Sequence, residues 1–260
     1  MTSTPDPARD PARRLEGMVA LVTGGAQRVG RAIALRLGEA GMDVAVTYRT
    51  SAVEAEQVVK RITQMGRRAQ AIRVDLADAN AANQVHGKFI ECFDRLDALV
   101  NNASWFDVSP IGQITTDLFD RSVAINCRAP LMLIQKFAPM LARHYPDCRG
   151  RVINFIDIHV MGQPLAGYAA YNASKAALEE VTMTAAIELA PQTTVNAIAP
   201  GVVAWAPSYT ASQRKLYMKR VPLGRPGTPQ DAAAAVLFLV RDADYCTGQI
   251  IKLDGGRLLT

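Results

Sequence analysis

The stretch MVALVTGGAQRVG, residues 18–30, decides the fold. Its apolar run up to Thr23 is typical of a buried strand, and the amphipathic segment that follows, from Val29 to Ala40, is typical of a helix. Gly24 permits a tight turn between them. Gly30 lets the helix pack closely against the sheet, with its N-terminus directed at a bound anion. This order of strand, glycines and helix predicts a dinucleotide-binding turn.

The same alternation of strands and helices continues along the chain. Further strands are expected in DVAVTY (43–48), AQAIRV (69–74), DALVNN (97–102), RVINFI (151–156), TTVNAIA (193–199) and QIIKL (249–253), and helices in residues 53–65, 81–93, 117–143, 169–189 and after the capping residue Thr228. Strands that alternate with helices of this length indicate right-handed βαβ units. The expected fold class is therefore α/β, a single-domain Rossmann-type doubly wound parallel sheet with helices on both faces, over residues 18–260.

Composition limits the class of protein. The 260 residues are 49% hydrophobic and carry a formal charge of +5, which favours one globular domain. Lys and Arg are scattered among acids, so no nucleic-acid partner is expected. No apolar run approaches the ~20 residues that cross a bilayer, so we expect a cytoplasmic protein without a membrane partner. The four cysteines form no C-x-x-C pair, which predicts reduced thiols and no metal site. Residues 1–17, rich in Pro and Arg, are expected to form a disordered tail.

The residues after the second strand indicate the cofactor. An NAD site would place Asp or Glu there to bind the ribose, whereas this chain reads YRTS, residues 48–51. Arg49 can bind a phosphate with two parallel hydrogen bonds, and Arg28, which replaces the middle glycine of the usual cluster, could reach the same group. We therefore expect NADPH as the cofactor.

Two polar segments follow the third and fourth strands. Asp75 in VDLAD is suited to the edge of an adenine, and the NNAS segment from Asn101 to Ser104 would lie beside a cofactor in a doubly wound sheet. Both segments would also serve as structural caps, and this alternative stays open.

Tyr171 and Lys175 are four residues apart at the start of an Ala-rich helix, so their side chains lie on one face. An ammonium near a phenol favours the phenolate, and the spacing therefore predicts a tyrosine whose pKa is lowered for use as an acid near neutral pH.

The chain resembles the short-chain dehydrogenase/reductases from Leu15 to its end, in TGGAQRVG, VDLAD, NNA, AIN, YNASK, PG at 200–201 and TGQIIKLDGG. The resemblance implies that Tyr171 donates the proton, that Lys175 lowers its pKa and holds the nicotinamide ribose, and that Asn126 holds a water of the proton relay. The cofactor contacts that it implies are Gly24, Arg28, Val29, Gly30, Tyr48, Arg49, Thr50, Ser51, Asp75, Leu76, Asn102, Ala103, Ser104, Tyr171, Lys175, Pro200 and Gly201.

The usual serine of this family is replaced by Asp157, and the chain then resembles the pteridine reductases, including bacterial dihydromonapterin and dihydrofolate reductases of this fold. The arginine of TGGAQRVG, the YRTS segment, NNASWF and QPLAGYAAY agree with that subgroup, although one extra residue separates Asp157 from Tyr171. A carboxylate can accept hydrogen bonds from the aminopyrimidine of a pterin. The resemblance implies that Phe106 stacks on the pterin and that Ser104 binds it or a cofactor phosphate. The expected substrate contacts are Ser104, Phe106, Asp157 and Tyr171.

Alternatives remain open at this point. The expected activity is reduction of a dihydropterin, and whether dihydrofolate is also reduced stays open. The rivals are a carbonyl or ketoacyl reductase of the same family and a non-catalytic NADPH-binding sensor or scaffold. Trp105 and Phe106 could instead anchor a loop, and His159 is given no role. Residues 202–225 are expected to form an irregular, mobile substrate loop. The resemblance also implies a homotetramer, with helices 117–143 and 169–189 in one interface and the last helix and strand in another.

Overall fold

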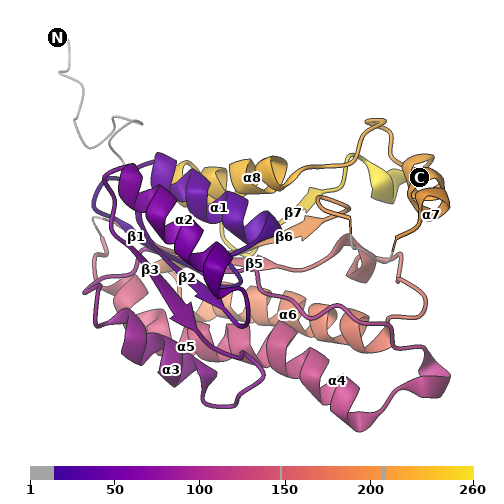
Figure 1. Ribbon diagram of the computed structural model, residues 1–260, viewed down its shortest axis with the longest axis horizontal. Coiled ribbons are helices and arrows are strands. Elements are labelled where there is room, and N and C mark those ends of the chain that lie inside the picture. Colours follow the sequence, from indigo (N-terminus) through magenta and orange to yellow (C-terminus); the bar gives the residue numbers. More distant parts are fainter. Residues whose placement is uncertain (1–14, 147, 206–208) are drawn as a thin grey trace.

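The computed structural model describes residues 15–146, 148–205 and 209–260. Within them, seven parallel strands form one sheet in the order β3-β2-β1-β4-β5-β6-β7 (Figure 1). The strands are β1 (Val19–Val22), β2 (Asp43–Tyr48), β3 (Ala69–Arg73), β4 (Ala98–Asn101), β5 (Gly150–Phe155), β6 (Thr193–Pro200) and β7 (Ile250–Leu253). Because the order reverses between β1 and β4, their carboxyl ends form the crevice where such sheets bind ligands.

Helices cover both faces of the sheet, as expected (Figure 1). One layer holds α1 (Arg28–Glu39), α2 (Ala52–Gln64) and α8 (Pro229–Arg241), and the other holds α3 (Ala81–Phe89), α4 (Thr116–Val123), α5 (Ala129–Ala142) and α6 (Ala169–Glu188). Alternate residues of β1 enter the two cores. Ala20 and Val22 pack toward α1 and α8, whereas Val19 and Leu21 pack toward the opposite layer.

The long helix expected over residues 117–143 is interrupted. A π-helical segment, Ala124–Arg128, joins α4 to α5 and contains the fully buried Asn126. Extra residues of this kind inside a helix are common at functional sites, because they turn one side chain out of the regular register. Periodicity over the whole span could not distinguish this segment from a straight helix.

Residues 202–225 are more regular than expected. They contain α7 (Ala211–Met218), which begins at a reciprocal cap: the Thr210 hydroxyl accepts from the Gln213 backbone N–H, and the Gln213 side chain accepts from the Thr210 N–H. The Thr-x-x-Gln spacing predicts such a cap and was the available signal. The expectation of an irregular segment is therefore wrong for residues 211–218, and residues 206–208 lie outside the described part.

The N-terminal boundary also differs. The expected disordered tail lies outside the described residues up to position 14, but Leu15 is only 1% exposed and packs in the core beside β1. Glu16 pairs with Arg67 at 3.0 Å. Disorder as far as residue 17 is therefore the wrong expectation. None of the described helices is long and apolar enough to cross a membrane.

Candidate active site

The glycine turn after β1 is built for close approach of backbone atoms. Gly24 has a φ of +63°, in the left-handed region that favours glycine. A Cβ on Gly30 would lie 2.2 Å from the carbonyl oxygen of Gly24, so this position accepts no larger residue. The Asn102 side chain donates to the carbonyl oxygen of Thr23 at 2.9 Å and holds the turn from β4. This narrow cradle at the start of α1 fits a dinucleotide phosphate.

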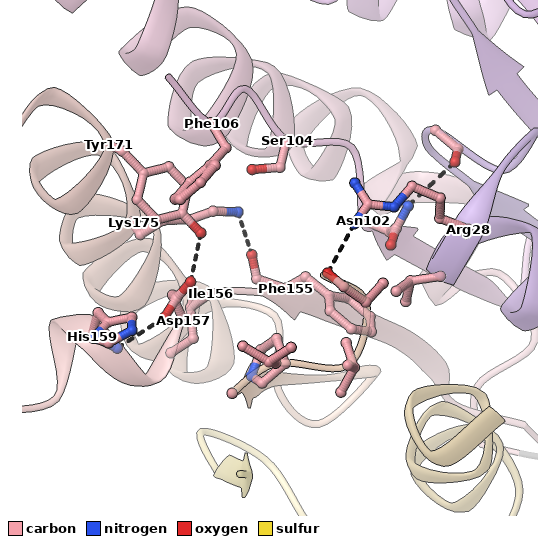
Figure 2. Close-up of a pocket in the computed structure, with 18 of the residues that line it drawn as sticks. Arg28, Asn102, Ser104, Phe106, Phe155, Ile156, Asp157, His159, Tyr171 and Lys175 are labelled. Atoms are coloured by element: carbon pink, nitrogen blue, oxygen red, sulfur yellow. Dashed lines mark hydrogen bonds between the residues drawn. The ribbon is translucent and has the colours of Figure 1, made fainter. Parts of the chain in front are cut away.

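Arg28 lies at the middle position of the cradle in a strained conformation. Its φ is +49°, and it is the sole non-glycine residue with a positive φ in the described part of the chain. Its guanidinium donates to the backbone oxygen of Ala204 at 2.8 Å (Figure 2) and to that of Trp205 at 3.0 Å. Arg28 therefore joins the glycine turn to the segment that follows β6, in addition to lining the cavity between them.

The cavity has a volume of about 440 Å³ and contains the expected catalytic group. The Tyr171 hydroxyl donates to Asp157 Oδ2 at 2.7 Å, and Lys175 Nζ donates to the carbonyl oxygen of Phe155 at 2.6 Å (Figure 2). The second Asp157 oxygen accepts from the backbone N–H of His159 at 2.9 Å. The extra residue between Asp157 and Tyr171 therefore does not separate them, because the intervening loop closes back from the end of β5 to the start of α6.

The protonation of this group differs from the expectation. Burial raises the pKa of Tyr171 well above its ordinary value, and the Asp157 charge and hydrogen bond raise it further. The expected lowering of the Tyr171 pKa by Lys175 is therefore wrong. Burial also lowers the pKa of Lys175 to about 8, with Asp157 opposing the shift. Near neutral pH, Tyr171 holds its proton and Lys175 is mainly charged.

Asn126 connects two parts of the site through its side chain. Its oxygen accepts from the Ser104 hydroxyl at 3.2 Å and the Trp105 N–H at 2.7 Å. Its nitrogen donates to the Trp105 carbonyl oxygen at 2.8 Å and the Ser174 hydroxyl at 2.9 Å. The amide thus makes all four hydrogen bonds open to it. These bonds tie the loop after β4 to the catalytic helix and leave only the Asn126 backbone for the expected water.

Aromatic side chains line part of the cavity and pack behind its lining. Phe106 stacks on Tyr168 with ring centroids 4.4 Å apart and meets Tyr171 edge-on at 4.8 Å. Tyr209 and Tyr217 also line the cavity, and Trp205 contacts both rings, each at 5.5 Å. Sequence reasoning missed these two tyrosines, and their place within residues 202–225 was the signal that could have found them.

The predicted cofactor residues divide into two groups. Those that line the cavity are Gly24, Arg28, Val29, Gly30, Asn102, Ala103, Ser104, Tyr171, Lys175, Pro200 and Gly201. The others lie outside the cavity lining, at or after the ends of β2 and β3. They are Tyr48, which is the last residue of β2, and Arg49, Thr50, Ser51, Asp75 and Leu76. All of the predicted substrate contacts line it, and so does His159, which was given no role.

Comparison with known proteins places this chain in a family. A family profile described as Enoyl-(Acyl carrier protein) reductase matches residues 24–257. The chain belongs to the short-chain dehydrogenase/reductase family. An uncharacterized oxidoreductase of Mycobacterium tuberculosis (strain CDC 1551 / Oshkosh) is 37% identical, with 94% of this chain and 93% of the relative covered. A 3-oxoacyl-[acyl-carrier-protein] reductase of Synechocystis sp. (strain ATCC 27184 / PCC 6803 / Kazusa) is 32% identical, with 94% and 98% covered.

Solved structures of the short-chain dehydrogenase/reductases agree closely with this fold. A short chain dehydrogenase from Burkholderia cenocepacia J2315 in complex with NADP has a TM-score of 0.87 and 36% identity, with 94% of this chain and 99% of that chain covered. A blue fluorescent protein from a metagenomic library in complex with NADPH has a TM-score of 0.85 and 34% identity, with 93% and 98% covered.

Proposed function

We propose that this protein is an NADPH-dependent reductase that converts a dihydropterin to its tetrahydro form. The observation that carries the proposal is the 2.7 Å hydrogen bond from Tyr171 to Asp157 inside the cavity, at the position where the family usually has a serine. This arrangement joins a buried acid that holds its proton to a half-buried carboxylate.

The charge of Asp157 favours a C=N bond over a C=O bond as the group reduced. Hydride addition to a carbonyl places negative charge on its oxygen, which a carboxylate beside the proton donor would destabilise. Reduction of a C=N bond instead places a proton on a basic nitrogen, and an adjacent carboxylate stabilises the cation. Asp157 can also accept from the N–H groups of an aminopyrimidine. Tyr171 would deliver the proton to the ring nitrogen, and Phe106 would offer an aromatic contact for the ring.

The cradle and the cavity fit a bound NADPH, which would supply the hydride. Gly24, Gly30 and the first turn of α1 would bind its phosphates, while Lys175 would bind the nicotinamide ribose. The absence of an acid at residues 48–51 and the presence of Arg49 favour a phosphorylated ribose. Relatives whose structures contain NADP or NADPH support the same choice.

A ketoacyl reductase is the second candidate. Relatives named 3-oxoacyl-[acyl-carrier-protein] reductase support it, including one from Staphylococcus epidermidis (strain ATCC 12228 / FDA PCI 1200) at 36% identity. This activity would require the hydrogen-bond donor that Asp157 lacks when ionised. Replacing Asp157 with Ser would restore such a donor.

The two candidates are separated by following NADPH oxidation with dihydrobiopterin, dihydromonapterin, dihydrofolate and an acetoacetyl thioester. We expect turnover of a dihydropterin, with a loss of roughly 100-fold or more in Tyr171→Phe and Asp157→Asn. Asp94→Asn is the matched control, since Asp94 is exposed and lies before the amino end of β4, whereas the cavity lies at the carboxyl ends of the strands. Turnover of the thioester alone, retained or raised in Asp157→Ser, would overturn the pterin proposal in favour of ketoacyl reduction.

We also propose that the protein assembles as a homotetramer through the outer faces of α4, α5 and α6. These helices expose large apolar side chains: Phe119 is 41% exposed, Leu131 38%, Met183 39% and Ile187 80%. Exposed apolar side chains of this kind on packed helices favour burial against another copy.

A further inference from the structure

Trp105 is the centre of a charged cluster outside the cavity lining. The guanidinium carbon of Arg121 lies 4.5 Å from the centroid of the Trp105 ring, and that of Arg49 lies 5.5 Å away. Arg121 also pairs with Asp75, with Nη2 to Oδ2 at 3.4 Å. These four residues, called the Trp105 cluster below, come from α4 and from the segments that follow β2, β3 and β4.

The Trp105 cluster adjoins the glycine turn. The Thr47 hydroxyl accepts from the backbone N–H of Gly24, and the Thr47 carbonyl oxygen accepts from that of Gly25, each at 3.1 Å. Arg49 therefore follows, by two residues, the residue that holds the turn. The Trp105 backbone is fixed by Asn126 through both its N–H and its carbonyl oxygen. The cluster thus extends the cradle along the carboxyl edge of the sheet, away from Tyr171.

Both arginines keep hydrogen-bond donors for a ligand. Stacking uses the face of a guanidinium and leaves the N–H groups at its edge available. Among the described residues, no hydrogen bond from the Arg49 side chain occurs, and Arg121 donates only through Nη2, to Asp75, which leaves its Nη1 for a ligand. The Arg121–Asp75 pair is long, and its two side chains are 34% and 43% exposed, so it holds Arg121 only weakly. Two arginines and one aspartate leave one net positive charge. A phosphate monoester, with several acceptor oxygens and negative charge, is the ligand that suits this group.

We propose that Arg121 is a second guanidinium, beside Arg49, that binds the 2′-phosphate of NADPH, with stacking on Trp105 holding Arg121 in position. The proposal rests on the proposed NADPH dependence and adds a specificity-determining residue on α4. Stacking on Trp105 would lower the conformational entropy lost when the phosphate binds.

The test measures the Kd values of NADPH and NADH, which differ only by this phosphate, from the quenching of indole fluorescence. The sequence has two tryptophans, so Trp205→Phe leaves Trp105 as the only indole. In that background we expect Arg121→Ala to raise the Kd of NADPH roughly 10- to 100-fold, the loss expected for hydrogen bonds to a charged group, with less than about a 2-fold change for NADH. Arg121→Lys should recover only part of the lost affinity, because an ammonium group lacks the planar face that stacks on an indole and the paired N–H groups that bind a phosphate bidentately. Arg36→Ala is the matched control, since Arg36 is an exposed arginine of α1 that pairs only with Glu39 in the described structure.

Each outcome decides the proposal. A selective loss of NADPH affinity, which shrinks as the salt concentration rises, supports it. Equal losses for NADPH and NADH in Arg121→Ala would overturn it and would make Arg121 a structural partner of Asp75. An unchanged Kd for both cofactors would also overturn it, while the proposed activity would stand. If the parent itself binds NADH as tightly as NADPH, the proposed NADPH dependence fails together with this inference.

Discussion

Asp157 changes what Tyr171 can do as an acid. The carboxylate accepts the Tyr171 hydrogen bond, and its charge, together with burial, raises the pKa of the tyrosine. Loss of the Tyr171 proton is therefore unfavourable unless a basic group takes the proton or a positive charge lies beside the pair. Lys175 supplies the positive charge nearby, but its own pKa is lowered by burial. This balance suits a proton transfer that ends on a basic nitrogen.

The lowered pKa of Lys175 predicts a pH dependence of folding stability. In the folded protein Lys175 loses its proton near pH 8, whereas in the unfolded chain it keeps the proton up to its ordinary value of 10.5. Between these values the unfolded state binds more protons, so the free energy of unfolding of the parent should rise with pH relative to Lys175→Met. Urea unfolding of both proteins at several pH values measures this difference.

Lys175→Met serves as the reference because it removes the titrating group and keeps an unbranched side chain of similar length. Below pH 8 the difference between the two proteins should be constant. Stability curves that stay parallel from pH 8 to 10.5 would contradict a lowered Lys175 pKa.

At the scale of elements, α1 and the turn before it depend on contacts that only glycine permits. The backbone of Gly24 and the Asn102 side chain occupy the space that a side chain at Gly30 would need. This close approach sets the position of the α1 N-terminus against the sheet, and therefore of the cofactor cradle.

Two Gly→Ala substitutions should have opposite effects. Gly30→Ala should destabilise the fold by about 2 kcal/mol or more, since its Cβ would lie 2.2 Å from the Gly24 oxygen and 2.6 Å from Asn102 Nδ2. Gly87→Ala on the exposed face of α3 meets no atom within 4 Å and should stabilise by roughly 0.5–1 kcal/mol. Chemical denaturation measures both. A neutral Gly30→Ala would show that the turn relaxes and that the cradle is looser than described.

Arg28 should carry strain that glycine would relieve. Arg28→Gly and Arg28→Ala both lose the hydrogen bonds to Ala204 and Trp205, so hydrogen exchange in residues 202–205 should rise in both. Because φ at this position is +49°, the glycine variant should be more stable than the alanine variant by about 1 kcal/mol. Equal melting temperatures would mean that the turn adapts its backbone to alanine without cost.

At the scale of the whole molecule, the sheet brings the two halves of the site together from opposite ends of the chain. The glycine turn comes from residues near the start, whereas the Tyr171 pair and the segment after β6 come from the second half. The outer faces of α4, α5 and α6, with Ile187 at 80% exposure, form the interface proposed above.

The proposed tetramer predicts a change of mass on mutation. Ile187→Lys should shift the mass measured by light scattering toward a smaller oligomer, because it places a charge in the proposed apolar interface. Val53→Lys is the control: Val53 is 65% exposed on α2, outside the proposed interface, and its substitution should leave the mass unchanged. A parent that elutes as a monomer, or a tetramer unaffected by Ile187→Lys, would contradict the interface.

The amino-acid sequence alone determined the order of the strands and of most helices, the glycine turn and the four-residue spacing of Tyr171 and Lys175. These features are local, because periodicity, capping and turn chemistry act between residues near one another in the chain. The π-helical segment and α7 were missed: the first does not alter the apolar periodicity over a long span, and the second depends on one short cap.

Tertiary structure decided the features that join distant residues. The direction of the Tyr171 pKa depends on burial and on the Asp157 carboxylate, and the four hydrogen bonds of Asn126 depend on a loop and a helix from other parts of the fold. The stacking of Arg49 and Arg121 on one tryptophan likewise requires the ends of β2 and β4 to meet α4. Burial, nearby charges and hydrogen bonds between distant residues depend on the three-dimensional arrangement, so their effects arise only when the chain has folded.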